Sequence, residues 1–247
     1  MRPLLLLTRP EPQSQRFAQA ALAGCPPHEL LVAPLSRIAK IQFDPRAFAD
    51  ADALILTSAN ALPMLRDLPL KGLTAWCVGA ATAEAAQQYG FTAITGGGTA
   101  KALITRLEQA EPQGKLIHAH GRHLAKDIAA TLRPSGLNVF GIAVYEAEKV
   151  DWPDTVTQTL EQAQRVIAPL FSPRAARQFV QQLGTARPEG LHLVAISEAC
   201  AAALPGDLRR HTTIANAPDA GEMLRAIAEA MSQPVEDVLR RAQAMDK

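Results

Sequence analysis

Short apolar runs alternate with segments of helical hydrophobic spacing along almost the whole chain. Residues 53–57 (ALILT) and 166–171 (VIAPLF) are mostly apolar, and an amphipathic segment follows each of them. Strands that are apolar on both faces and alternate with helices are typical of parallel sheets covered by helices on two sides. The pattern therefore predicts an α/β protein.

The boundaries of the predicted elements follow from the same pattern. Strands are expected over residues 3–8, 29–34, 53–57, 74–79, 92–95, 115–120, 138–147, 166–171, 191–197 and 212–217. Helices are expected over residues 13–23, 59–67, 81–89, 99–109, 123–133, 153–163, 174–183, 198–204 and 219–230. The tail 232–247 is charged and is expected to add a surface helix without chemistry of its own.

Four units of the sequence occur twice in similar form. The pairs are ALILTSANAL with VIAPLFSPRAARQF, AWCVGAATAEAAQQYG with LHLVAISEACAAALPG, FTAITGGGTAKALITRL with TTIANAPDAGEMLRAI, and PLLLLTRPEPQSQRFAQAALAG with KLIHAHGRHLAKDIAATLRPSG. Chance similarity between alanine-rich helices is the alternative explanation. The order of the units favours two flavodoxin-like parallel-sheet domains, one inserted in the other.

The domain boundaries follow from the positions of these units. We expect residues 1–34 and 150–247 to form domain 1, and residues 49–140 to form domain 2. The chain then crosses between the domains at 35–48 and again at 141–149. Both crossings have β-prone, alternating character, so we expect them to pair as a two-stranded β-ladder.

Composition and charge exclude several classes of partner. The formal net charge is +1 over 247 residues, so no overall field attracts nucleic acid or a membrane surface. The three cysteines lie far apart without metal-binding spacing, which indicates reduced thiols. The first apolar run is too short for a signal peptide, and no run approaches the length of a membrane span. We expect a soluble, cytoplasmic protein, and a monomer is the simplest assembly.

Polar residues recur directly after the predicted strands. Ligands of open parallel sheets bind beyond the carboxyl ends of the strands, so these residues are candidates to bind an anionic ligand. Helix N-termini at that edge favour carboxylates without many lysines. Serines at such junctions are also good N-caps, and pure helix capping is the alternative for each of them. The candidates are Arg9, Thr57, Ser58, Asn60, Thr82, Arg122, Ser172, Arg174 and Ser197.

Two motifs resemble cofactor sites, one a nucleotide-binding loop and the other a metal site, but neither is expected to bind a cofactor. The turn GGGT at 96–99 lacks the Gly-Lys-Ser/Thr of a Walker loop, and the chain has no Rossmann GxGxxG, so nucleotide binding is not expected. In HAHGRH, His118 and His120 share one face of a strand and His123 lies beyond the turn. Without an acidic or thiol partner nearby, these histidines are polar residues at a strand end rather than a metal site.

The tyrosine in the second crossing differs from the other tyrosine of the chain. Tyr89 lies at the end of a predicted helix and is expected to pack there, whereas Tyr145 lies where the two domains meet. A phenol at this position can donate a hydrogen bond or a proton to a bound ligand. Packing against the hinge is the alternative role of Tyr145.

Several of these stretches together resemble the uroporphyrinogen-III synthase family. They are LLLTRP, TSANAL, WCVGAATAEAA, AHGRHLAKDIAATLRPSGLNV, AVYEAEK, LFSPRAARQF, ISEACAAAL and NAPDAGEMLRAI, and their order and spacing carry the resemblance from about residue 3 to residue 231. The resemblance implies two α/β domains joined by a β-ladder, with the active site in a cleft between them. It also implies a cofactor-free reaction in haem biosynthesis. Hydroxymethylbilane, a linear tetrapyrrole, loses water and closes to uroporphyrinogen III with inversion of ring D.

The resemblance also suggests roles for particular residues. It implies that Tyr145 is the proton donor, and that Ser172 and the turn Thr57, Ser58 and Asn60 bind substrate. Arg9 and Arg122 match basic or polar positions at strand ends. One departure is the sequence SEAC at 197–200, where some family members have a Gly-x-x-Thr turn. Ser197 can replace that hydroxyl, whereas Glu198 suits an anionic substrate only if it points away.

Two other functions compete with this enzyme. One is a two-domain protein that binds a small anionic ligand without catalysis. The other is a flavodoxin-like regulatory or interaction module whose helix caps are only structural. Formation of the type III isomer distinguishes the enzyme from both alternatives.

Overall fold

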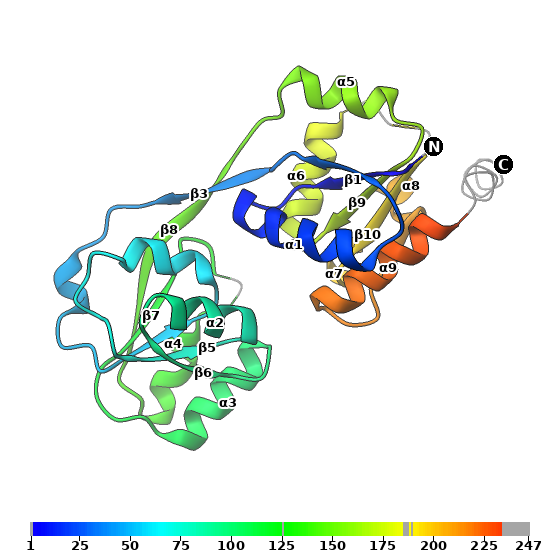
Figure 1. Cartoon of the computed structure of the whole chain (residues 1–247). Helices are drawn as coiled ribbons and strands as arrows, with labels where there is room; N and C mark the ends of the chain where they lie inside the picture. The colour runs from blue at the N-terminus through cyan, green and yellow to red at the C-terminus, as the bar shows by residue number, and fades with distance from the viewer. Residues whose placement is uncertain (1, 125, 185–187, 189, 234–247) are drawn as a thin grey trace. The chain divides into compact units, whose positions relative to one another are not determined.

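The computed structural model describes residues 2–124, 126–184, 188 and 190–233. These residues form a mixed α/β fold with parallel sheets, which confirms the predicted class. The chain divides into two compact units (Figure 1). Residues 1–37 and 149–247 form one of them, the discontinuous unit, and residues 38–148 form the continuous unit.

The discontinuous unit is built on a five-stranded sheet in which all neighbouring strands pair in parallel. Its strand order is β11-β10-β9-β1-β2. The strands are β1 (Leu4–Leu7), β2 (Glu29–Val32), β9 (Val166–Leu170), β10 (Leu191–Ala195) and β11 (Thr212–Ile214). The helices are α1 (Glu11–Gly24), α5 (Asp154–Gln162), α6 (Pro173–Leu183), α7 (Glu198–Ala201), α8 (Gly206–Arg210) and α9 (Ala220–Ser232).

Alternation along β1 explains why this sheet is covered on both sides. Leu4 and Leu6 pack into a core with α5, α6 and α7, whereas Leu5 and Leu7 pack into a second core with α1 and α9. All four leucines are buried. Burial of a leucine side chain contributes roughly 2 kcal/mol, so four consecutive buried leucines strongly favour an interior position for this strand.

The second sheet has six strands in the order β3-β8-β7-β4-β5-β6, and all of it except the start of β3 and the last residue of β8 belongs to the continuous unit. Its strands are β3 (Ser36–Lys40), β4 (Ala53–Leu56), β5 (Thr74–Cys77), β6 (Thr92–Thr95), β7 (Leu116–Gly121) and β8 (Val139–Lys149). Strands β4 to β8 pair in parallel, and β3 is the neighbour of β8. The helices are η1 (Pro45–Phe48), η2 (Ala59–Leu65), α2 (Ala80–Gln88), α3 (Ala100–Ala110), α4 (Ile128–Leu132) and η3 (Arg133–Ser135).

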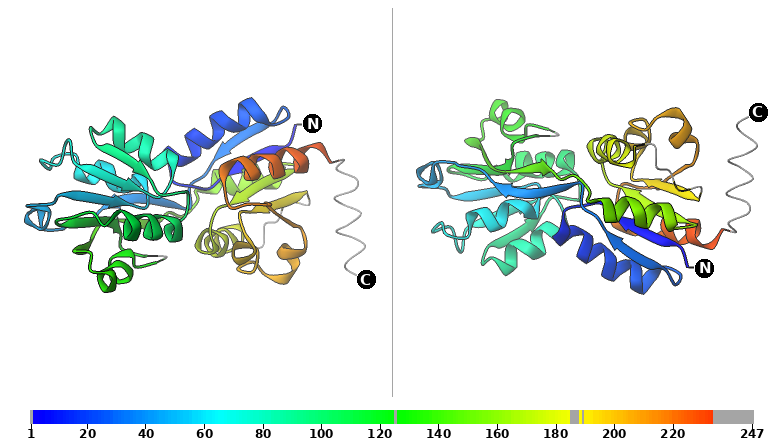
Figure 2. Two further views of the ribbon diagram at one scale, coloured as in Figure 1. Left: turned by 90° about the horizontal axis from the view of Figure 1, so that it is seen from below. Right: turned by 90° about the horizontal axis from the view of Figure 1, so that it is seen from above.

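This second sheet also has a core on each face. Leu54 and Leu56 pack with η2 and α2 on one face, while Ala53 and Ile55 pack with α3 and α4 on the other. In the two views of Figure 2, helices lie on both sides of each sheet. The carboxyl ends of the parallel strands therefore form the edge at which loops and helix N-termini gather.

Two predicted helices differ from the structure. The segment expected as a helix over 59–67 is the 3₁₀-helix η2, which contains Pro63. Proline has no N–H for helical hydrogen bonding, which disfavours a regular α-helix there. The helix expected over 123–133 begins only at Ile128, because the side chain of Asp127 accepts from the Ala130 N–H at 2.9 Å and caps the helix at that point.

Two short helices were not predicted, and part of the predicted tail is not described. The 3₁₀-helix η1 and helix α8 have four and five residues, too few to give a clear helical period. Helix α9 continues to Ser232, at the beginning of the predicted tail helix. The remainder of that prediction, residues 234–247, lies outside the described residues.

Candidate functional site

The candidate residues lie at the carboxyl ends of the parallel strands. In the continuous unit, Thr57 and Ser58 directly follow β4, Thr82 lies in the first turn of α2 after β5, and Arg122 follows β7. Tyr145 lies within β8, next to the end of β7. The prediction that these residues follow strands is confirmed, because the strands end where the apolar runs end.

The structure brings three of these side chains together in the continuous unit. The phenol of Tyr145 is hydrogen-bonded to the side chains of Ser58 and Asn60. Ser58 is the N-cap of η2, and its hydroxyl oxygen accepts from the Asn60 N–H at 3.2 Å. Because this hydrogen bond uses only a lone pair of the Ser58 oxygen, the hydroxyl proton of Ser58 remains available to donate to the phenol oxygen.

Burial and hydrogen bonding act in opposite directions on Tyr145. Burial is the larger effect and raises the pKa of the phenol, while the hydrogen bonds from Ser58 and then Asn60 lower it. Because the net shift is upward, the phenol is protonated at neutral pH. Ser58 and Asn60 stabilise the phenolate that would remain after proton transfer. The arrangement suits a proton donor whose conjugate base is supported in place.

Arg122 lies beside Tyr145 but already has an anionic partner. Its backbone N–H donates to the Tyr145 carbonyl at 2.8 Å, which ties the end of β7 to β8. Its Nε lies 2.7 Å from the Glu146 carboxylate, and the two side chains are 55% and 31% exposed. A second carboxylate would have to share this guanidinium with Glu146. Thr57 and Thr82 are half-buried at the same edge of the sheet.

In the discontinuous unit, serine caps mark two strand ends. Ser172 is the N-cap of α6, and its hydroxyl accepts from the Ala175 N–H at 3.1 Å, with Pro173 in the first turn. Ser197 caps α7 by accepting from the Cys200 N–H at 3.3 Å. The structure thus confirms the capping that was considered for Ser58, Ser172 and Ser197. Capping uses only the oxygen acceptor, so the O–H groups of Ser172 and Ser197 can still donate to an anion.

Arg9 is the best-placed cation near the end of β1. Its guanidinium lies 4.4 Å from the centroid of the Phe171 ring, a cation–π contact. Burial, and then the charge of Arg16, lower the pKa of Arg9, but a guanidinium remains charged. Since Phe171 directly precedes Ser172, this contact brings Arg9 to the start of α6. Arg174 is half-buried in the first turn of the same helix, and Glu198 is exposed.

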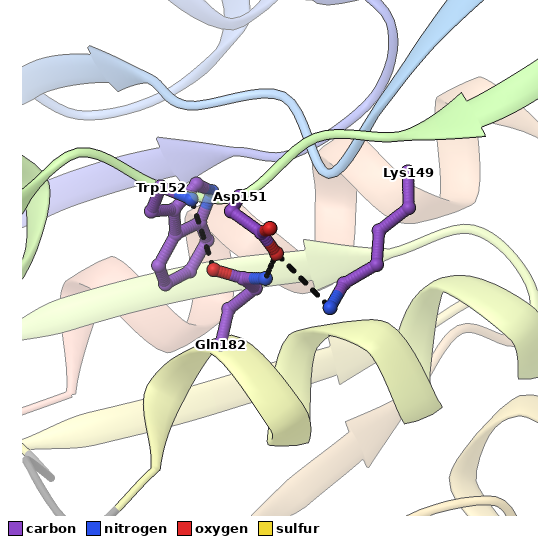
Figure 3. Close-up of polar contacts among 4 residues, drawn as sticks. All are labelled: Lys149, Asp151, Trp152 and Gln182. Carbon is purple, nitrogen blue, oxygen red and sulfur yellow. Dashed lines mark hydrogen bonds and ion pairs between the residues drawn. The ribbon is translucent and has the colours of Figure 1, made fainter.

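A polar cluster that the sequence did not suggest lies just after β8 (Figure 3). Asp151 accepts from Gln182 at 2.6 Å and pairs with Lys149 at 3.0 Å, and Gln182 accepts from the Trp152 N–H at 2.9 Å. The Trp152 indole donates to the Ala33 carbonyl at 2.9 Å. These contacts fix the segment after β8 to α6, so their role is structural. The hydrogen bond from Lys149, followed by that from Gln182, lowers the pKa of Asp151.

The two histidines of β7 have a structural environment rather than that of a metal site. His118 is fully buried beside His120, with ring centroids 4.8 Å apart, and neither of its ring nitrogens has a hydrogen-bond partner. Burial, followed by repulsion from His120, lowers the pKa of His118 to about 4, so the ring is neutral at physiological pH. Within the described residues, no group of three or more His, Cys, Asp or Glu side chains is placed to hold a metal ion.

The cysteines are unpaired, as their spacing predicted. Cys77 and Cys200 are buried, Cys25 is half-buried, and all three are free thiols. Burial raises the pKa of Cys77 to about 11, which makes it a poor nucleophile. Among the residues that the structure describes, no helix is both long and apolar enough to cross a membrane.

Sequence reasoning missed two neighbours of the candidate residues. Gly121 contacts the Tyr145 ring, and Phe171 stacks on Arg9. An isolated glycine at the end of a strand run often marks a close approach of another group, and this signal could have identified Gly121. Phe171 could not be singled out, because an aromatic residue at the end of an apolar run is equally consistent with core packing.

Comparisons with known proteins agree on one family. A family sequence model described as "Uroporphyrinogen-III synthase HemD" matches residues 26–225. A solved uroporphyrinogen-III synthetase from Helicobacter pylori has a TM-score of 0.66 at 18% identity, and the alignment covers 93% of this chain and 99% of that one. A mutant uroporphyrinogen III synthase from Thermus thermophilus has a TM-score of 0.51 at 18% identity, covering 94% and 100%. None of the curated proteins matches the chain.

Proposed function

The chain belongs to the uroporphyrinogen-III synthase family, and we propose that Tyr145 and the strand-end polar groups carry out its reaction. Members of this family cyclise hydroxymethylbilane in haem biosynthesis. The chain is accordingly a cyclising lyase, and a ligand-binding role without catalysis is not favoured. The observation that carries the proposed mechanism is the half-buried Tyr145 phenol, hydrogen-bonded to Ser58 and Asn60 at the carboxyl ends of the strands.

The proposed chemistry begins at the terminal hydroxymethyl group of the substrate. Electrons from the adjoining pyrrole expel the hydroxyl group as the Tyr145 phenol transfers its proton to the leaving oxygen, so that water departs. The azafulvene cation that remains is attacked by the substituted carbon of ring D, giving a spiro intermediate. The bond between that carbon and the methylene bridge to ring C then breaks, which leaves an azafulvene cation on ring C. The unsubstituted α-carbon of ring D attacks this methylene, so ring D is inverted, and loss of the proton from that α-carbon completes uroporphyrinogen III. The phenolate left at Tyr145 is stabilised by Ser58 and Asn60 until it is reprotonated.

The substrate supplies most of the driving force for this reaction. Pyrroles ionise their own leaving groups readily, and spontaneous ring closure gives the unrearranged isomer. The protein therefore contributes mainly by holding the chain in the geometry that leads to inversion. Because the pKa of Tyr145 is raised, the donor form persists through neutral pH, and turnover should decline only as the phenol ionises in alkaline solution.

We propose that substrate carboxylates bind polar groups at the strand ends of both units. The capping residues Ser172 and Ser197 retain an O–H donor, and the first turns of helices such as α6 carry unpaired N–H groups and a positive dipole end. Arg9 is held at the start of α6 by Phe171, which supports its role as an anion-binding group. The other proposed contacts come from Thr57, Asn60, Thr82, Arg122, Arg174 and Ser197.

We further propose that the two units are flavodoxin-like domains, one inserted in the other and joined by a β-ladder. The strand orders β2-β1-β9-β10-β11 and β8-β7-β4-β5-β6 support this proposal, because both match the flavodoxin-like pattern after circular permutation of the continuous unit. The neighbouring strands β3 and β8 are the proposed ladder. The enzyme is proposed to work as a cytoplasmic monomer without a cofactor.

The product isomer tests the proposed function. Freshly prepared hydroxymethylbilane should be converted to uroporphyrinogen III, measured as the type III porphyrin after oxidation and chromatographic separation. Spontaneous closure gives type I, so heat-inactivated protein in the same buffer is the matched control. If the native protein yields only type I at the spontaneous rate, the chain binds anionic ligands without catalysing this reaction.

A further inference from the structure

Strands β7 and β8 change register next to Tyr145. His120 pairs with Ala143, but the next residue of β7, Gly121, pairs with Tyr145, so Val144 has no partner on β7. This is a β-bulge, in which two residues of one strand lie opposite one residue of the other. The extra residue places Val144 and Tyr145 together opposite Gly121.

The bulge changes the face of the sheet on which Tyr145 lies. In a regular strand, successive side chains point to opposite faces, so Tyr145 would lie on the face opposite to Val144. Instead, Ile142, Val144 and Tyr145 all pack into the core that contains η2. Ser58 and Asn60 belong to the N-terminus of η2, on this same face. Without the bulge, the phenol would lie on the face covered by α3 and α4, away from both of its hydrogen-bond partners.

Gly121 provides the space that the re-aimed ring occupies. A Cβ atom at Gly121 would lie 2.7 Å from Cε2, 2.9 Å from Cζ and 3.2 Å from the hydroxyl oxygen of Tyr145. Gly121 does not have a positive φ, so its backbone conformation is open to any residue. A glycine is therefore needed here for space rather than for conformation, and any larger residue would force the ring to move.

We infer that Gly121 and the bulge at Val144 are positioning elements for the phenol of Tyr145. The bulge turns the side chain toward Ser58 and Asn60, and Gly121 leaves the space beside β7 that the ring occupies. This inference rests on the proposed role of Tyr145 as proton donor. It adds that the donor position depends on a residue that has no functional group of its own.

Gly121→Ala tests the inference when combined with Tyr145→Phe. In an otherwise wild-type chain, Gly121→Ala should lower kcat by about 10- to 100-fold with little change in KM, because a displacement of the donor by about 1 Å can cost about 100-fold. In the Tyr145→Phe background the ring clash persists but the proton donor is gone, so Gly121→Ala should change kcat by less than about twofold. An equal loss of kcat in both backgrounds would make Gly121 a purely structural residue and overturn the inference.

A matched control is available on the neighbouring strand. A Cβ atom at Gly141 would lie 3.0 Å from Nε2 of His120, so Gly141→Ala also crowds an aromatic side chain of the same strand pair, but on the opposite face. This variant should lose little kcat. A loss in Gly141→Ala as large as that in Gly121→Ala would show that crowding anywhere in the strand pair is sufficient, and would contradict the positioning role.

The ring position can be measured without relying on activity. The chain has only two tyrosines, so Tyr89→Phe leaves Tyr145 as the sole site for 3-fluorotyrosine. The ¹⁹F resonance should shift in Gly121→Ala and stay in place in Gly141→Ala. If Tyr145→Phe proves fully active, the donor role fails, yet this resonance still decides whether Gly121 positions the ring. An unmoved resonance in Gly121→Ala rejects the inference.

A stability cycle covers the case in which Gly121→Ala folds poorly. The melting temperature lost in Gly121→Ala should be recovered when Tyr145 is also changed to Ala, because the clashing ring has been removed. It should not be recovered with Tyr145→Phe, which keeps the ring. Equal loss in all three backgrounds would show that the Tyr145 ring is not the group that Gly121 accommodates.

Discussion

The two units have matching strand orders but are assembled from the chain in different ways. The sheet of the discontinuous unit has the order β2-β1-β9-β10-β11 and combines the N-terminus with the second half of the chain. The matching strands of the continuous unit, β8-β7-β4-β5-β6, come from one uninterrupted segment. The same parallel arrangement therefore does not require one chain order. It requires interior strands that are apolar on both faces and helices to cover them.

The matching strand ends differ in their chemistry. After β9, Ser172 caps an α-helix of 11 residues, and Arg9 stacks on Phe171 beside it. After the matching strand β4, Ser58 caps a 3₁₀-helix and shares its hydroxyl with Tyr145. One unit thus presents a cation and a helix dipole, which suit an anion, whereas the other presents a supported phenol, which suits proton transfer.

The matching faces of the central strands differ as well. The face of β1 covered by α1 and α9 carries Leu5 and Leu7. The corresponding face of β7, covered by α3 and α4, carries Leu116 and then His118. A fully buried imidazole without hydrogen-bond partners takes the place of a leucine in the other unit. This difference affects stability rather than chemistry, and it leads to the largest predicted effect.

His118 should make the continuous unit sensitive to acid. Its pKa is about 4 in the folded protein, below the ordinary value of 6.5, so the unfolded state binds a proton between these values while the folded state does not. Stability should therefore fall as the pH drops from about 6.5 to 4, by roughly 3 kcal/mol from this group alone. Urea unfolding followed at several pH values measures the loss.

His118→Leu gives β7 the residue type that β1 carries on the corresponding face. This variant should be more stable at pH 5 than the wild type, and its stability should vary less between pH 6.5 and 4. The control is His123→Leu, which replaces a histidine just beyond the end of β7. This variant should retain the wild-type dependence of stability on pH. If His118→Leu loses as much stability between pH 6.5 and 4 as the wild type, groups other than His118 cause the sensitivity to acid.

Tyr145→Phe should affect turnover more than folding. Removal of a proton donor typically lowers kcat by about 100- to 10,000-fold, and a loss at or below the low end is expected here because the substrate ionises readily. Lost hydrogen bonds to Ser58 and Asn60 should cost only about 1 kcal/mol in unfolding free energy. Single-turnover kinetics with isomer analysis measures the first effect, and denaturant unfolding measures the second. Wild-type turnover in this variant would remove Tyr145 from the mechanism.

The capping residues Ser58 and Ser172 should respond differently to substitution. Ser172→Ala should cost about 1 kcal/mol of stability, whereas Ser172→Asp keeps the cap and places a negative charge where a substrate carboxylate is proposed to bind. We therefore expect Ser172→Asp to raise KM while retaining stability. Ser58→Ala should instead lower kcat a few-fold, because Tyr145 loses a hydrogen-bond partner. An unchanged KM in Ser172→Asp would leave Ser172 with a capping role only.

Much of the fold could be predicted from local pattern. Ten strands were expected, and each is observed with its ends within a few residues, because consecutive buried apolar residues mark them strongly. The 3₁₀-helix at 59–65 and the late start of α4 were not predicted. Both depend on single residues, Pro63 and Asp127, whose effects compete with a helical pattern that covers many positions.

The sequence predicted that the candidate residues lie at strand ends, but it did not predict which of their side chains contact one another. The positions of Ser58 and Ser172 after apolar runs identify the strand ends, and the second crossing strand draws attention to Tyr145. Strict alternation along β8 would have placed Tyr145 on the opposite face from Val144, and only the bulge reverses this. Register shifts depend on contacts between strands that are distant in the sequence, so local spacing cannot reveal them.

By itself, the amino-acid sequence determined the α/β class, the strand ends and the polar residues that follow them, because these depend on the hydrophobic pattern within short segments. The tertiary structure alone decided which of these residues meet. Ser58, Asn60 and Tyr145 lie together because residues 58 and 145 are brought to the same sheet face by pairing between β4, β7 and the bulged β8. Likewise, only the packing of other elements around His118 in the folded protein leaves both of its ring nitrogens without hydrogen-bond partners.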